Sequence, residues 1–230
     1  MMCYRRYMDT RERLVKAAAE LLIDGGKEAV STRAVASAAG VQAPTLYRLF
    51  GDKDGLLDAV AAYGFSDYLA TKHAMGASDN PVDDLRRGWE LHIGFGLARP
   101  AFYLLMYGEP RKREARLEAD AMLREIISRI AAVGRLTVPV EQAAQFVHAA
   151  GMGVVLSLIA TPEEERDLEL ITFSREQVIR AITTDVLPDE PTDIPSRAIA
   201  LRVALEEDPP LMLSPAERAL LAEWLNRVAK

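Results

Sequence analysis

The sequence predicts an all-α protein, and three observations lead to that expectation. Half of the 230 residues are hydrophobic and the mean hydropathy is near zero, which is typical of a soluble globular chain. Ala, Leu, Arg and Glu dominate, whereas the alternating Val, Ile and Thr runs of strands are scarce. Apolar residues recur at helical spacing along the chain, and its length is enough to bury a sizeable core.

The first helix is expected over about residues 9–24, after a short arm formed by residues 1–9. Leu14, Ala18 and Leu22 lie on one face at helical spacing and therefore predict a buried side. Gly25 and Gly26 follow directly and predict the end of this helix.

Two short helices joined by a tight turn are predicted between residues 31 and 53. Ser31 is a good N-cap for the first of them, and Val35, Ala38 and Ala39 predict its buried face. Gly40 stands where a helix is usually ended by a residue in the left-handed conformation.

In the second short helix, Leu46, Leu49 and Phe50 form the inward stripe. The residues left on the outer face are small, polar or hydrogen-bonding, with no carboxylate: Gln42, Ala43, Thr45, Tyr47 and Arg48. Such a face suits the DNA major groove, where small residues allow close approach and polar ones read base edges. The pattern predicts a helix-turn-helix.

Longer helices are expected further along the chain. Asp52 is the expected N-cap of a helix reaching about residue 75, and Ser214 with Glu217 forms a capping-box pattern. The predicted helices between these points cover about residues 82–98, 100–108, 112–133, 139–160, 174–187 and 197–207, and the last helix covers 215–229. Residues 188–195 are acidic and rich in proline, which predicts a linker.

From about Thr10 to Val60 the chain resembles the TetR family of transcriptional regulators. The pieces that carry the resemblance are R-E-R-L-V-K-A-A-A-E-L-L, S-T-R-A-V-A-S-A-A-G-V, T-L-Y-R-L-F and G-D-K-D-G-L-L, in this order and at this separation. The resemblance implies an N-terminal three-helix DNA-binding domain followed by a helical ligand-binding and dimerisation domain. The chain departs from the family pattern at Leu49, and at Gln42, where the family often carries Ser.

The residues expected to contact DNA are Thr32, Arg33, Gln42, Ala43, Pro44, Thr45, Tyr47, Arg48 and Lys53. We expect Gln42 and Thr45 to read bases, and Lys53 to hold a phosphate together with the positive end of its helix. The resemblance implies a phosphate contact for Tyr47, although core packing alone is the alternative role for its ring. The expected partner is a palindromic double-stranded operator bound by two recognition helices.

Charge is distributed unevenly, although the chain as a whole carries −6. Residues 1–55 have a net charge of +2 and the remainder a net charge of −8. A locally positive first domain fits phosphate binding, and an acidic second domain discourages non-specific wrapping of DNA.

Between Gln142 and Pro162 there is no Asp, Glu, Lys or Arg. The segment contains two Gln, a His and two Gly, so a buried helix is favoured over a membrane span. The resemblance implies a homodimer through helices 139–160 and 174–187, because the family pairs such helices across a four-helix interface. A central core helix in a monomer is the alternative.

A pocket for a small apolar or aromatic effector is expected in the second domain, and the resemblance strengthens this expectation. The aromatic, Met and His residues proposed to line it are Trp89, His92, Phe95, Tyr103, Met106, Tyr107, Phe146, His148 and Met152. The alternative is that these side chains at helical spacing are ordinary core.

The expected domains are residues 1–55 for DNA binding, 56–188 for effector binding and dimerisation, and 189–230 as a linker and helical extension. An enzyme is disfavoured because no metalloprotease, hydrolase or phosphate-loop motif is found, and no catalytic, metal or cofactor site is expected. The single cysteine, Cys3, and a start unlike a secretory signal predict a cytoplasmic protein. The sequence thus predicts a DNA-binding regulator, most simply a repressor released by its effector, with an effector-free regulator as the alternative.

Overall fold

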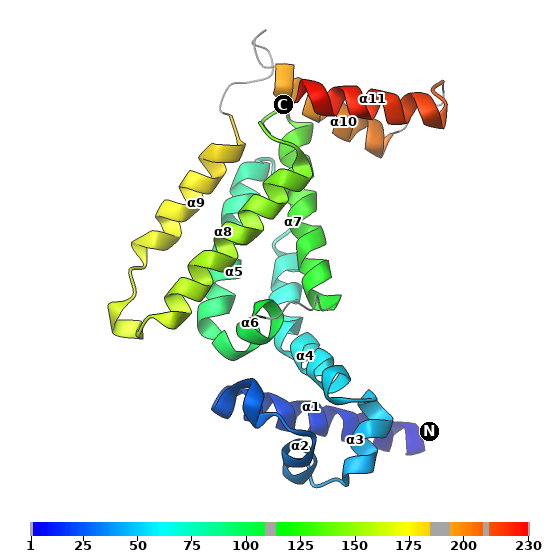
Figure 1. The fold of residues 1–230 in the computed structure, drawn as a ribbon, viewed down its shortest axis with the longest axis vertical. Coiled ribbons are helices and arrows are strands. Elements are labelled where there is room, and N and C mark those ends of the chain that lie inside the picture. The colour runs from blue at the N-terminus through cyan, green and yellow to red at the C-terminus, as the bar shows by residue number, and fades with distance from the viewer. Residues whose placement is uncertain (1, 109–113, 185–193, 209–211, 230) are drawn as a thin grey trace. The chain divides into compact units, whose positions relative to one another are not determined.

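The computed structural model describes residues 2–108, 114–184, 194–208 and 212–229, with side chains described from Thr10 in the first helix and from Arg116 in α7. The chain forms two compact units, each described by itself (Figure 1). Unit 1 comprises Met1–Met75 and Phe95–Ala119, and unit 2 comprises Gly76–Gly94 and Asp120–Lys230.

The all-α class is confirmed for the described residues, whose only β-type pairing is an isolated bridge. The helices are α1 (Met2–Ala29), α2 (Thr32–Ala38), α3 (Ala43–Phe50), α4 (Lys53–Ala74), α5 (Pro81–Ala98), α6 (Pro100–Tyr107), α7 (Glu114–Ala132), α8 (Val140–Ala160), α9 (Glu169–Ile182), α10 (Ile194–Glu207) and α11 (Pro215–Val228). One turn of 3₁₀ helix, Glu163–Glu165, lies between α8 and α9.

Two details of the first helices differ from the sequence-based expectation. The helix begins at Met2, so residues 2–9 form no separate arm, and its backbone is non-helical at Gly25 and Gly26 before it resumes. In α2 the buried residues are Val35 and Ala36, whereas Ala38 is exposed. The helix has only seven residues, so the tilt of its axis against α1, which the sequence does not show, selects the buried face.

The core of unit 1 is built where α1, α4 and α6 pack on one another. Leu14 and Leu22 of α1 and Leu57 and Val60 of α4 are almost completely buried, as their helical spacing predicts. The ring of Phe102 in α6 lies directly on Gly64 of α4, where a Cβ atom would come within 2.0 Å of the ring. Helices α4 and α6 therefore approach more closely than any residue other than glycine at this position allows.

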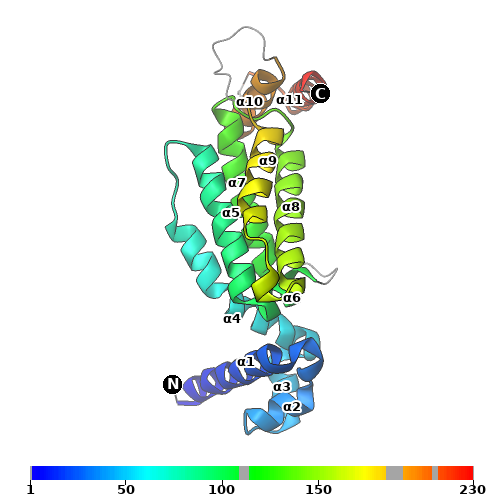
Figure 2. The ribbon, with the colours of Figure 1, turned by 90° about the vertical axis from the view of Figure 1, so that its left-hand side faces the viewer.

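In unit 2, α8 and α9 lie side by side (Figure 2). Helix α9 begins at Glu169, five residues before the expected position 174, and the Glu169 N–H donates to the carboxylate of Asp167 just before the helix (3.0 Å). It ends at Ile182 instead of 187, because Thr183 leaves the helix to pair with Leu136 across an antiparallel bridge. Residues 185–187 of the predicted helix lie outside the described residues.

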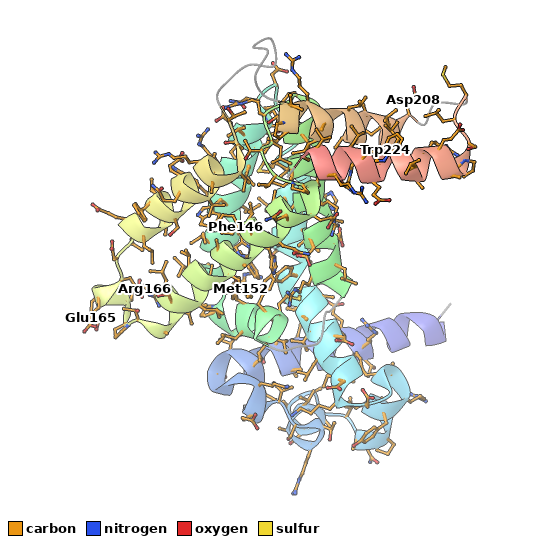
Figure 3. All side chains as sticks on the ribbon, turned by 45° about the horizontal axis from the view of Figure 1, so that its top comes forward. Phe146, Met152, Glu165, Arg166, Asp208 and Trp224 are labelled. Atoms are coloured by element: carbon orange, nitrogen blue, oxygen red, sulfur yellow. The ribbon has the colours of Figure 1, made fainter. Side chains whose placement is uncertain are left out.

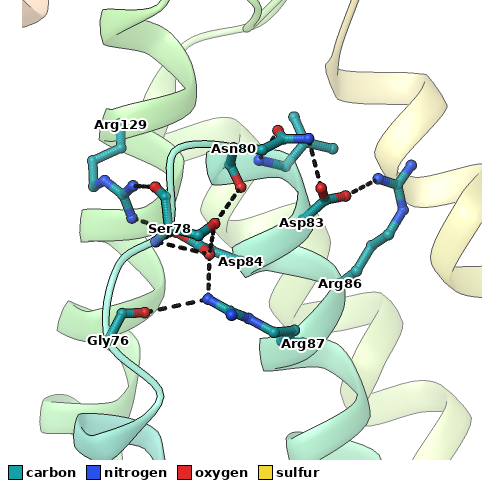
Figure 4. A network of polar contacts seen from close by, with 9 residues as sticks. Gly76, Ser78, Asn80, Asp83, Asp84, Arg86, Arg87 and Arg129 are labelled. Carbon is teal, nitrogen blue, oxygen red and sulfur yellow. Dashed lines mark hydrogen bonds and ion pairs between the residues drawn. The ribbon is translucent and has the colours of Figure 1, made fainter.

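The segment before α5 is held by a buried carboxylate (Figure 4). Asp84 is completely buried and accepts hydrogen bonds from the N–H and Oγ of Ser78, from Arg87 and from Arg129 of α7. Burial by itself raises the pKa of Asp84, but the hydrogen bonds from Ser78 and Arg129 outweigh it, so that the pKa lies below its ordinary value.

The C-terminal helices α10 and α11 pack on each other as a helical hairpin. Helix α11 begins with the predicted capping box, in which Ser214 accepts from the Glu217 N–H and the Glu217 carboxylate accepts from the Ser214 N–H. Leu221 and Leu225 face α10 across a small gap, whereas Trp224 remains half exposed (Figure 3). The apolar residues Leu221, Trp224, Leu225 and Val228 of this helix are therefore only partly covered within unit 2.

Candidate nucleic-acid interface

The predicted helix-turn-helix is formed by α2, α3 and the turn between them. The Ser31 side chain accepts a hydrogen bond from the Ala34 N–H (3.1 Å) and so caps α2, as the sequence predicts. Gly40 has a φ of +65°, which glycine adopts at little cost, and the turn closes with a bond from the Val41 N–H to the Ala36 carbonyl (2.9 Å).

Helix α3 buries one side chain completely and turns its polar residues outward. Leu46 has no exposed surface, whereas half of Tyr47 is exposed and Gln42 and Arg48 lie at the surface. Gln42 is the N-cap residue of α3, but its side chain makes no capping hydrogen bond. The amide group of Gln42 is therefore available at the exposed end of this helix for an external partner.

Three cationic side chains at this surface have no partner for their positive charge within the described part of the chain. Arg33, Arg48 and Lys53 form no ion pair or hydrogen bond with any other residue that the structure describes. In unit 2, by contrast, Arg86 and Arg129 each bind a carboxylate of the same unit. Positive side chains without an internal partner are what phosphate binding requires.

The start of α4 is capped from within the chain. The Asp52 carboxylate accepts from the Gly55 N–H (2.8 Å), which confirms the predicted N-cap. Lys53 is the first helical residue, so its ammonium group, rather than the capped N–H of Gly55, is available for a phosphate here.

Three contacts that the sequence reasoning missed support this surface. Arg13 of α1 donates to the carbonyl of Ala39 at the end of α2 (2.8 Å), which satisfies one of the helix's last acceptors. The Arg11 guanidinium lies 5.2 Å above the ring of Phe50 at the end of α3. The Tyr47 hydroxyl lies 3.5 Å from the Thr32 Oγ, so both predicted contact residues belong to one surface.

Comparison with known proteins identifies this part of the chain. The family model described as bacterial regulatory proteins, tetR family, matches residues 14–60. The class C tetracycline repressor protein of Escherichia coli is 49% identical over 51 residues, which cover 22% of this chain and 23% of the repressor. Residues 14–60 therefore match the TetR family. The aligned part of the chain spans about a quarter of that curated relative.

Solved structures extend the likeness to about three quarters of the chain. A putative TetR-family transcription regulator from Shewanella sp. PV-4 aligns with a TM-score of 0.62 at 21% identity, covering 76% of this chain and 98% of that one. A protein of unknown function from Rhodococcus sp. RHA1 aligns with a TM-score of 0.64 at 22% identity, covering 76% and 96%. At such identities the likeness concerns the fold alone.

Four of the nine residues expected to line an effector pocket lie in the core of unit 1. Phe95, Tyr103, Met106 and Tyr107 belong to it, and all but Phe95 are buried. The rings of Phe95 and Tyr103 lie 6.5 Å apart and those of Tyr103 and Tyr107 4.6 Å apart, in a cluster that also contains Phe65. Burial raises the pKa of Tyr103 far above its ordinary value, so its phenol stays neutral.

The other five residues lie in unit 2: Trp89, His92, Phe146, His148 and Met152. Trp89 and His92 of α5 face Gly151 of α8, where a Cβ atom would lie 3.7 Å from the Trp89 ring and 3.3 Å from His92. His148 approaches the Asp120 carboxylate (3.3 Å between Nδ1 and Oδ1), whereas Phe146 is 45% exposed. The structure thus divides the nine residues between two units.

Helix α8 is long and apolar enough to cross a membrane, judged by length and composition alone. The core helix of a soluble protein passes the same test, and one face of α8 is buried at Ala143, Val147 and Val154. A second apolar stripe of α8 is exposed or half-buried in the single chain, and it contains Phe146, Ala149, Gly153 and Leu156.

Proposed function

We propose that this chain is a sequence-specific DNA-binding transcriptional regulator that acts as a homodimeric repressor and is released from a palindromic operator by a small apolar effector. The observation that carries the proposal is the exposed face of α3, where Gln42, Tyr47 and Arg48 are presented without any carboxylate. Arg33 and Lys53, which form no ion pair or hydrogen bond with another described residue, support the same conclusion.

The separate roles of base reading and phosphate contact are tested by measuring affinity for operator and random DNA over a range of salt concentrations. Gln42→Ala is expected to cost about 1–3 kcal/mol on the operator and nothing on random DNA, because base contacts alone carry discrimination. Lys53→Gln should weaken both and reduce the slope of log K against log salt by about 1. Arg124→Gln on α7, whose partner is Glu141, is the matched control and should change neither affinity. Equal losses for Gln42→Ala on both DNAs would overturn base reading.

The proposed dimer rests on the outer stripe of α8 and its neighbour α9. Phe146 and Phe173 are 45% and 63% exposed, which is unusual for Phe on a surface that stays in contact with solvent. Gly153 lies on the same stripe of α8 and allows close approach of a second helix. A pair of such helices from two copies would give a four-helix interface, and binding to two half-sites one turn of B-DNA apart requires the two α3 helices of the dimer to lie about 34–36 Å apart.

Gly153 offers a clean test of that interface. A Cβ atom there meets nothing within 4 Å in the single chain, so Gly153→Arg should leave the monomer fold intact and disrupt only a dimer. Gly94 of α5 is equally open and exposed, which makes Gly94→Arg the matched control. Sedimentation should show Gly153→Arg as a monomer with weakened operator binding, and two variants that both remain dimers would refute this interface.

An effector site inside unit 2 is supported by Trp89. Its side chain is 4% exposed, and its indole N–H finds no hydrogen-bond acceptor among the described residues. A buried donor without a partner is costly, and an effector carrying an acceptor next to an apolar body would satisfy it. Such an effector lowers operator affinity if it binds the DNA-free form more tightly.

The effector and effector-free versions of the regulator are separated by a thermal-shift screen of apolar compounds with and without a carbonyl acceptor. A compound that stabilises the protein should also weaken operator binding, and Trp89→Phe should reduce its affinity about five- to tenfold by removing one hydrogen bond. A stabilising compound that leaves operator affinity unchanged would favour the regulator without an effector.

A further inference from the structure

Unit 1 contains a cavity of about 370 Å³, and none of the residues proposed above to contact DNA or an effector lines it. It lies among α1, α4 and the start of α6, and all its lining residues belong to unit 1. Its volume falls within the range of small-molecule sites, about 300–1,000 Å³. The lining residues that matter for its chemistry are Lys16, Glu20 and Ile23 of α1, Tyr63 of α4, Arg99, and Phe102 of α6.

The body of the cavity is apolar. Ile23 is 62% exposed and Tyr63 44% exposed, so both present hydrocarbon surface to the space, and Phe102 closes it where its ring packs on Gly64. An exposed Ile beside an aromatic wall gains free energy when a ligand covers it. The walls therefore favour a small apolar group.

Two cationic side chains that retain N–H donors border the cavity. Lys16 binds Glu12 (2.7 Å) with one of its three N–H donors. Arg99 binds the Asp67 carboxylate (2.9 Å) through Nη2 and the Gly64 carbonyl (3.4 Å) through Nη1, which uses two of its five N–H donors. Both cations thus retain donors, and both side chains are about half exposed. Among the charged residues that line the cavity, Glu20 is the one carboxylate against these two cations.

We propose that this cavity is a second ligand site, and that it binds a small carboxylate with an apolar body. The apolar body lies against Ile23, Tyr63 and Phe102, and the carboxylate is bound by Lys16 and Arg99. Such a ligand joins α1, which packs against the helix-turn-helix, to α4 and α6. This cavity is separate from the effector site proposed around Trp89 in unit 2.

A matched series of probes tests the sign of the charge. Isothermal titration calorimetry of the full chain with 3-phenylpropionate, 3-phenyl-1-propanol and 3-phenylpropylamine compares an anion, a neutral molecule and a cation on the same apolar body. The carboxylate is expected to bind at least five times more tightly than the alcohol, and the amine more weakly than either. Equal binding of acid and alcohol, tighter binding of the amine, or no binding of the acid would overturn the proposal.

Three surface variants place the binding in this cavity. Lys16→Gln should weaken 3-phenylpropionate about threefold or more, Glu20→Gln should strengthen it by a similar factor, and Ile23→Ser should weaken it. All three positions are exposed, at least half so for Lys16 and Ile23, so the fold is retained, as thermal melting checks. Arg124→Gln, in unit 2, is the control and should leave the affinity unchanged. Binding that Trp89→Phe abolishes and Lys16→Gln does not would move the site to unit 2 and refute this inference.

Discussion

Asp84→Asn removes the buried charge around which the start of unit 2 is organised. The carboxylate is 1% exposed and accepts from the Ser78 Oγ (2.6 Å), the Ser78 N–H (3.0 Å), one nitrogen of Arg129 (2.6 Å) and Arg87. Asparagine keeps one acceptor oxygen but presents an NH₂ group to at least one of these donors. The substitution therefore removes the negative charge and places the NH₂ group of Asn against another hydrogen-bond donor.

The expected cost follows from these contacts. A hydrogen bond to a charged group is worth about 1.5–3 kcal/mol, and breaking a buried ion pair typically costs about 3–5 kcal/mol. Because the side chains of Arg129 and Arg87 are 31% and 46% exposed, the lower end of that range, about 3 kcal/mol, is expected. Asp83→Asn is the matched control: Asp83 is 53% exposed, pairs with Arg86, and should cost at most about 1 kcal/mol.

The effect should depend on pH in a defined direction. The pKa of Asp84 is lowered in the folded protein, so its contribution is fully present above its ordinary value of 3.8. It is lost as the pH falls through the lower folded-state pKa. The difference in unfolding free energy between the wild type and Asp84→Asn should therefore be constant from pH 7 to about 5 and shrink below about pH 4.

Guanidinium unfolding followed by tryptophan fluorescence measures this, because Trp89 is buried in the same unit. The reasoning is refuted if Asp84→Asn and Asp83→Asn destabilise unit 2 equally at pH 7. It is also refuted if the difference between them grows as the pH is lowered.

Three further outcomes are expected. Gly64→Ala should lower the melting temperature of unit 1, at a cost of about 1–3 kcal/mol, because its Cβ would overlap the Phe102 ring; Phe102→Leu should partly restore stability in the double variant. Asp52→Ala should cost about 0.5–2 kcal/mol by removing the cap of α4, measured by thermal unfolding, and a loss below this range would mean that another group caps the helix. On DNA, Gln42→Ala should change which half-site sequences are preferred in a binding selection, while Lys53→Gln should leave that preference intact.

The helices and their ends were largely predictable because their signals are local. The N-caps at Ser31 and Asp52, the capping box at Ser214 and the turn glycine Gly40 all act within four residues of their partners. The same holds for the outward face of α3, where spacing alone separates buried Leu46 from the exposed residues.

The predicted end of α9 was wrong because a distant segment decided it. Helix α9 stops at Ile182 because Thr183 pairs with Leu136, which lies 47 positions earlier in the sequence. The nine pocket residues stay a prediction, and the sequence did not show that α5 passes from unit 2 into unit 1 between Gly94 and Phe95.

What the sequence determined by itself was the all-α class, the helix-turn-helix and the side chains that α3 turns outward, because helix propensity, capping and the period of 3.6 depend on residues a few positions apart. The tertiary structure alone decided that Arg129 meets Asp84 across 45 positions, that Phe102 packs on Gly64, and that Lys16 and Arg99 border one cavity. These contacts depend on how helices approach one another, and side chains far apart in sequence leave no periodic signal of that approach.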